Sequence, residues 1–264
     1  MTPLFIGAAA GYAGSAALYI TYLFGRKDRT LLLARGALAA ALLVHLALIG
    51  LLCSHKLNPL RDLSGALSLT AWLLGVGYLV TTLRTRLGPV GAFIAPLSLA
   101  LLISSRVTPH TQAASGAGVG PLGKLHIALV AMGVAAFGLA AAVALIYLFQ
   151  EAALKRKRIG PLFRRSPPLT ALDDAGRVLI LIGFPIFTLA MVTGVIWVAR
   201  LPGHEGFRIE YVISGVTWLI FALVILARLT IGWRGRQAAW ATVLGFVATV
   251  AVLVIYMGRR MLGG

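Results

Sequence analysis

Eight apolar runs, each nearly free of charged residues, follow one another along this sequence of 264 residues. A helix of about 20 apolar residues crosses the ~30 Å hydrocarbon core of a bilayer. The runs therefore predict an all-α fold, a polytopic membrane helix bundle with about eight transmembrane helices. The expected spans lie near residues 3–24, 31–53, 65–83, 88–104, 124–149, 176–199, 209–229 and 237–257.

The composition leaves no room for a separate soluble domain. Hydrophobic residues make up 59% of the chain and charged residues 12%, whereas roughly a quarter of the residues in a soluble domain are charged. We therefore expect residues 1–264 to form a single integral membrane domain. The acidic residues lie between the apolar runs or at their ends, which argues against an ion-coupled transporter. A transporter without ion coupling is a weaker alternative.

The basic residues set the expected orientation. Sixteen of the 24 Lys and Arg residues fall in or beside the first, third, fifth and seventh connections between the runs. By the positive-inside rule these connections face the cytoplasm, so both termini face the outside of a cytoplasmic (inner) membrane. The sixteen are Arg26, Lys27, Arg29, Arg35, Arg84, Arg86, Lys155, Arg156, Lys157, Arg158, Arg164, Arg165, Arg177, Arg228, Arg234 and Arg236.

The net charge of +17 indicates contact with membrane lipid headgroups, because the cations flank apolar runs. We expect no nucleic-acid partner. The strongly basic connection at 151–177 has two interpretations: a topology anchor against anionic lipid, or a docking site for an acidic protein. The single cysteine, Cys53, excludes an internal disulfide.

The sequence offers little catalytic machinery. It contains no paired carboxylates, no glycine-rich phosphate loop and no HExxH zinc motif, so we do not expect an enzyme. Among the five histidines, His45 lies within the second span and His126 begins the fifth. A neutral imidazole in an apolar helix bundle is a candidate axial ligand for haem iron.

His45 also has a structural interpretation. A histidine inside a bundle more often hydrogen-bonds a neighbouring helix than binds a metal. His45 lies before Ser54 by roughly 13 Å of helix, at 1.5 Å per residue, whereas His126 lies beside Lys124 at the end of its span. Both would bind one iron only if their helices were strongly offset.

The string GWRG lies in the short seventh connection. Its two glycines predict a tight turn whose backbone approaches another helix. Because arginine stays charged at membrane depth, we expect Arg228 and Arg234 to reach headgroups or helix-end carbonyls on the cytoplasmic side. Arg228, Gly232, Trp233, Arg234 and Gly235 are therefore expected to fix the joint between the last two helices and not to bind haem.

Three long strings stand out in the C-terminal half. They are LHIALVAMGVAAFGLAAAVALIYLFQE (125–151), PPLTALDDAGRVLILIGFPIFTLAMVTGVIW (167–197) and VTWLIFALVILARLTIGWRGRQAAW (216–240). Together they resemble the cytochrome c assembly protein family of the CcsA type, nearest its HemX- and YpjD-like branch. The first four spans match that family as hydrophobic helices, and His45 stands where YpjD-like members also carry a histidine.

The resemblance implies a haem site at the outer face. His126 matches one of the CcsA haem histidines, and Trp197 matches the tryptophan that precedes the CcsA tryptophan-rich loop. That loop reads RLPGHEGFRIEY here, Leu226 stands where a membrane histidine is expected, and the final YMGRRMLGG lacks the second outer histidine. The resemblance therefore implies an incomplete site: His126 is the candidate ligand of haem iron, Trp197 an apolar wall, and His45 a second candidate ligand.

Two functions follow from the resemblance. The first is a non-catalytic, haem-handling protein of cytochrome c biogenesis, working with a CcsB-like or other assembly subunit. The alternative is a HemX-like membrane regulator of haem biosynthesis, acting from the cytoplasmic face on a haem-synthesis enzyme through the basic connection.

Overall fold

All regular structure that the computed structural model describes is helical. The described residues are 2–25, 28–55, 59–85, 87–108, 119–157, 160, 166–200 and 209–261. The helices are α1 (Thr2–Phe24), α2 (Asp28–Ser54), α3 (Leu63–Arg84), the 3₁₀ helix η1 (Gly88–Val90), α4 (Gly91–Val107), α5 (Pro121–Lys155), α7 (Leu169–Ala199), α8 (Ile209–Thr230) and α9 (Arg236–Met261). Eight helical segments are long and apolar enough to cross a membrane, which confirms the prediction of an all-α bundle with about eight spans.

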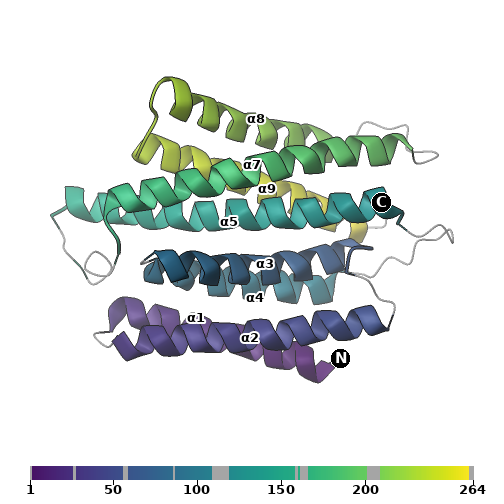
Figure 1. Cartoon of the computed structure of the whole chain (residues 1–264), viewed down its shortest axis with the longest axis horizontal. Helices are drawn as coiled ribbons and strands as arrows, with labels where there is room; N and C mark the ends of the chain where they lie inside the picture. The colour runs from purple at the N-terminus through teal and green to yellow at the C-terminus, as the bar shows by residue number, and fades with distance from the viewer. Residues whose placement is uncertain are drawn as a thin grey trace.

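The helices pack mainly as antiparallel neighbours, α1 with α2, α3 with α4, α5 with α7, and α8 with α9 (Figure 1). Helix α5 is central, because it also packs against α3 and α9. At its middle, Phe137 stacks on Phe221 of α8 with 3.7 Å between ring centroids, and it meets Phe187 of α7 edge-on. Helix α5 thus joins the first four helices to the last three.

Small residues let the paired helices approach closely. A Cβ atom added to Gly11 of α1 would lie 2.8 Å from the Cβ atom of Ala41 on α2. A Cβ atom added to Gly133 of α5 would lie 3.3 Å from that of Phe187 on α7. Close backbone approach of this kind increases van der Waals packing between helices in lipid, where no hydrophobic force drives their association.

Helices α5 and α7 are longer than the hydrophobic pattern predicts. Helix α5 continues to Lys155 and α7 already begins at Leu169, whereas the expected spans were 124–149 and 176–199. Charged residues pair along these extensions: Lys155 Nζ lies 2.8 Å from Glu151 Oε1, one turn away. The extended helices therefore carry their charges beyond the apolar stretch instead of ending where it ends.

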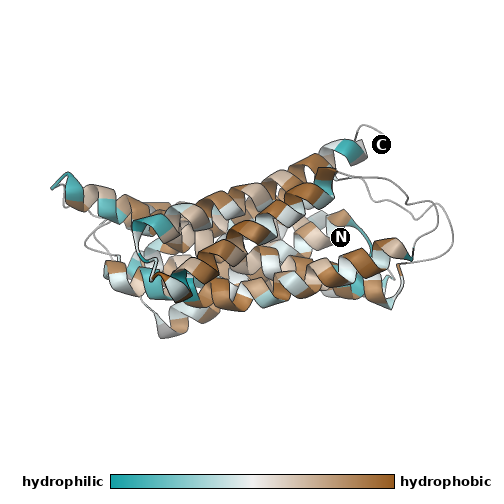
Figure 2. Cartoon of the chain, turned by 90° about the horizontal axis from the view of Figure 1, so that it is seen from above, coloured by the Kyte–Doolittle hydropathy of each residue, from teal (hydrophilic) through white to brown (hydrophobic). Residues whose placement is uncertain are grey.

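The described chain begins with α1 and ends with α9 at the same end of the bundle (Figure 1). We call this the terminal end, and the other the GWRG end. Hydrophobic residues occupy the middle of the helices and hydrophilic residues gather toward both ends (Figure 2). The distribution of basic residues predicts that the terminal end faces outward. This orientation stays a prediction.

Candidate functional site

His126 lies near the start of α5, at the terminal end, and faces α7. Its Nδ1 lies 2.8 Å from the backbone carbonyl oxygen of Ala190. Because a carbonyl oxygen only accepts hydrogen bonds, Nδ1 carries the proton and donates it. The lone pair of the neutral ring then belongs to Nε2, which makes no hydrogen bond to any residue that the structure describes. This is the arrangement that a metal-binding histidine requires.

Trp197 lies beside His126, so the structure brings these two predicted residues together. Their ring centroids are 5.7 Å apart, with the ring planes tilted by 43°. Two glycines make room for the rings: Gly194 of α7 lies under the His126 ring, and Gly123 of α5 lies under the Trp197 indole. Neither glycine is a predicted site residue, although Gly194 lies in the sequence TGVIW that ends with Trp197.

His45 lies in a different part of the bundle. It is fully buried, its Nδ1 lies 3.0 Å from the Tyr12 hydroxyl of α1, and its Nε2 lies 2.9 Å from the Ser68 hydroxyl of α3. Both ring nitrogens are therefore occupied, and iron coordination would require one of these bonds to break. Of the two interpretations that the sequence left open, this geometry favours the structural one.

The GWRG string forms the connection between α8 and α9. Gly232 has φ +69° and Gly235 has φ +68°, a left-handed conformation that glycine adopts without steric cost. The backbone N–H of Trp233 donates to the carbonyl of Ala227 at 3.0 Å. Gly235 also approaches Tyr147 of α5: a Cβ atom there would lie 2.7 Å from the tyrosine hydroxyl. Two separate constraints therefore select glycine at position 235.

The contact expected for Arg228, with headgroups or helix-end carbonyls, is wrong. Its side chain does not reach a headgroup: only 6% of it is exposed, and Nη2 lies 3.2 Å from Asp173 Oδ1 of α7. The correction has a simple cause, since burial of an arginine requires a nearby anion and α7 extends far enough to place Asp173 there. Arg234, in contrast, is exposed.

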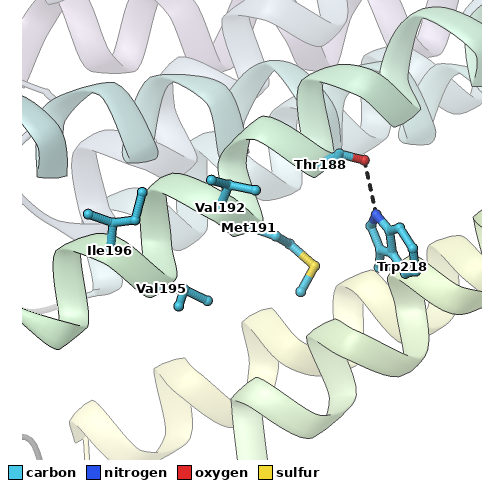
Figure 3. A pocket seen from close by; sticks show the side chains of 6 residues that line it. All are labelled: Thr188, Met191, Val192, Val195, Ile196 and Trp218. Atoms are coloured by element: carbon cyan, nitrogen blue, oxygen red, sulfur yellow. Dashed lines mark hydrogen bonds between the residues drawn. The ribbon is translucent and has the colours of Figure 1, made fainter.

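An apolar groove of about 360 Å³ lies between α7 and α8 (Figure 3). At one side of it, Trp218 Nε1 donates to the Thr188 hydroxyl at 2.9 Å. His126 is not among the residues that line this groove. The lining residues are Thr188, Met191, Val192, Val195, Ile196 and Trp218.

The described residues contain no group of three or more His, Cys, Asp or Glu that could hold a metal ion. His126 is therefore not part of a cluster of three or more such residues in the described ranges. The CcsA-like loop region 201–208 and much of the basic connection, including 158–159 and 161–165, lie outside the described residues.

Comparison with known proteins decides the family. The family model described as cytochrome C assembly protein matches residues 12–264. The chain belongs to the cytochrome c assembly protein family. It is a multi-pass membrane protein related to cytochrome c biogenesis.

Two curated relatives represent the two branches that the sequence resembles. Protein HemX of Bacillus subtilis (strain 168) is 30% identical over 189 residues, which cover 70% of this chain and 68% of HemX. Cytochrome c biogenesis protein CcsA of Guillardia theta is 25% identical over 226 residues, which cover 78% of this chain and 74% of CcsA. No solved structure is significantly similar to the chain.

One departure from the cytochrome c assembly pattern is visible in the structure. Leu226, which replaces the expected membrane histidine, is 55% exposed on α8 and faces away from the buried Arg228 pair. In this family member the position offers an apolar side chain to lipid, and it supplies no ligand.

Proposed function

We propose that this member of the cytochrome c assembly family is a non-catalytic haem-handling protein of the cytoplasmic (inner) membrane. It holds haem through His126 at the terminal end of the bundle. The observation that carries the proposal is the hydrogen bond between His126 Nδ1 and the Ala190 carbonyl oxygen.

This bond supports metal binding for two reasons. It fixes the orientation of the ring, and it raises the basicity of the other ring nitrogen, as carbonyl partners of metal-binding histidines do. Among the other histidines that the structure describes, His45 uses both nitrogens in hydrogen bonds, and His55 is exposed at the end of α2. His126 is therefore the described histidine that is best prepared to bind a metal.

The surroundings of His126 suit a haem group. His126 would hold haem, which would supply an iron that binds a neutral imidazole and a macrocycle that needs an apolar enclosure. Trp197 provides an aromatic wall beside the ring. A single protein ligand makes binding weak and exchangeable, which suits a protein that passes haem to a CcsB-like or other cytochrome c assembly subunit.

The test is a haem titration of the purified protein, followed by absorption in the Soret region. We expect substoichiometric haem after purification, and a large loss of affinity in His126→Ala. His126→Gln preserves a donor toward Ala190 but removes the imidazole, so it should lose affinity as well. His55→Ala is the matched control, and His45→Ala should retain the wild-type spectrum. Indistinguishable spectra and affinities for all of these proteins would falsify the haem site.

A second function has its own support. The relation to HemX, together with the exposed Lys155, Arg156 and Lys157 at the GWRG end, favours a regulator of haem biosynthesis that docks an acidic soluble enzyme on the cytoplasmic side. Purification from native membranes separates the two functions. A haem-free protein that retains a haem-synthesis enzyme, and loses it when these three cations become glutamine, would favour the regulator.

A further inference from the structure

Four helices meet around the side chain of Arg228, at the GWRG end of the bundle. A cavity of about 10 Å³ lies beside the guanidinium group. Small residues from three helices make the space. The cavity is lined by Ala140, Ala144 and Tyr147 of α5, Leu172, Asp173 and Gly176 of α7, Arg228 of α8, and Ala239 and Thr242 of α9.

The guanidinium group has more donors than the ion pair uses. Nη2 contacts Asp173, whereas Nε and Nη1 are buried and have no hydrogen-bond partner among the described residues. Buried polar groups in proteins are nearly always hydrogen-bonded, to protein or to ordered water. Because Nε–H and the Nη1 hydrogens lie on different edges of the planar guanidinium group, an acceptor in the cavity can pair with one of these two nitrogens, and the surrounding side chains do not supply it.

The size, polarity and charge of the cavity identify this acceptor. A volume of about 10–15 Å³ holds one water molecule, provided that two to four polar partners surround it. Besides Arg228 and Asp173, two residues with hydroxyl groups, Tyr147 and Thr242, line the cavity. The Thr242 hydroxyl donates to the Ala238 carbonyl at 2.7 Å, so its lone pairs can still accept a hydrogen bond. Asp173 already balances the charge of Arg228, so a neutral acceptor suffices.

We propose that one water molecule binds in this cavity, accepts a hydrogen bond from Arg228, and completes a polar junction of α5, α7, α8 and α9. The water connects the α8–α9 pair to the α5–α7 pair, next to the Arg228–Asp173 ion pair. It is independent of His126, which lies at the opposite end of the bundle.

Gly176 provides a sharp test. A Cβ atom added there would meet only Val143 Cγ1, at the ordinary contact distance of 4.0 Å, so Gly176→Ala places a methyl group at the cavity without a clash. In a helix interior, glycine to alanine normally stabilises. Here the methyl group displaces the water and leaves its Arg228 donor unpaired, so the apparent melting temperature should fall by at least about 2 °C.

Gly215→Ala is the matched control, because a Cβ atom at Gly215 of α8 meets nothing within 4 Å. Its melting temperature should stay the same or rise. In an Arg228→Met background, Gly176→Ala should no longer be destabilising, since the donors are gone. If Gly176→Ala stabilises the wild-type protein as much as Gly215→Ala does, the water site is refuted.

A direct measurement covers the case in which Arg228→Met does not fold. Hydroxyl radicals generated by X-rays from a bound water modify the side chains that contact it, so Tyr147 should be labelled in wild type and labelled several-fold less in Gly176→Ala. Equal labelling would overturn the proposal. A change in melting temperature when chloride is replaced by gluconate would also overturn the proposal, because the occupant would then be a chloride ion.

Discussion

The ring of His126 packs over Gly194, where a Cβ atom would lie 2.7 Å from Cε1 and 2.9 Å from Nδ1. The same relationship recurs in the opposite direction, since a Cβ atom on Gly123 would lie 2.7 Å from Cε2 of Trp197. Each of the two helices therefore has a glycine against which an aromatic ring of the other helix packs. The positions of both rings depend on residues that have no side chain.

Gly194→Ala should weaken haem binding. The added methyl group pushes the His126 ring away from α7 and breaks the hydrogen bond to Ala190, and loss of such a supporting bond costs about 10-fold or more in metal affinity. A haem titration measures the effect. Gly215→Ala, in open surroundings on α8, should bind as wild type does; equal affinities for both variants would contradict the assignment.

His45→Ala should destabilise the fold and leave haem affinity unchanged. The variant leaves the buried hydroxyls of Tyr12 and Ser68 without their imidazole partner, and an unsatisfied buried group costs about 1–3 kcal/mol in the free energy of unfolding. Thermal unfolding in detergent measures this loss. His55→Ala, an exposed control, should unfold like wild type. A stable His45→Ala protein that has lost haem would instead make His45 a ligand.

Gly235→Ala should reduce the amount of folded protein more than Gly232→Ala. Both positions have positive φ, which costs roughly 1–2 kcal/mol for a residue with a Cβ atom. Only Gly235 also approaches another helix, at the Tyr147 hydroxyl. Size-exclusion chromatography of the solubilised protein measures the folded fraction. Normal accumulation with altered haem content alone would show that this turn serves the haem site.

Cys53 should react with a membrane-impermeant thiol reagent from the outside. It is exposed near the end of α2, at the terminal end, which the basic residues orient outward. Intact cells, permeabilised at the outer membrane if they have one, provide the assay. Alkaline phosphatase fused after Gly264 should also be active. Labelling restricted to inverted vesicles, with an inactive fusion, would reverse the orientation.

The number of helices could be predicted from the sequence because the thickness of a bilayer fixes the length of an apolar span. The helix ends could not. The apolar run ends near residue 149, but α5 continues to Lys155, and Glu151 and Lys155 pair along this extension. A charged residue ends an apolar run without ending a helix.

The candidate site was predictable only in part. His126 and Trp197 could be found from the resemblance, because a family motif consists of side chains that can be matched by position. Ala190 acts through its carbonyl oxygen and Gly194 through its lack of a side chain, so neither leaves a chemical signal in the sequence. Arg228 was misplaced because its partner, Asp173, becomes its neighbour only when α7 and α8 pack together.

The central position of α5 also bears on how the protein is made. Most of the apolar part of α5 is buried in the folded chain. Yet α5 leaves the ribosome before α7 and α9 have been synthesised. It is long and apolar enough to enter the bilayer alone, with its small-residue faces in lipid until later helices cover them. A nascent chain that stops after α5 therefore holds His126 in the membrane without Ala190 or Trp197, and the site forms only when the sixth crossing arrives.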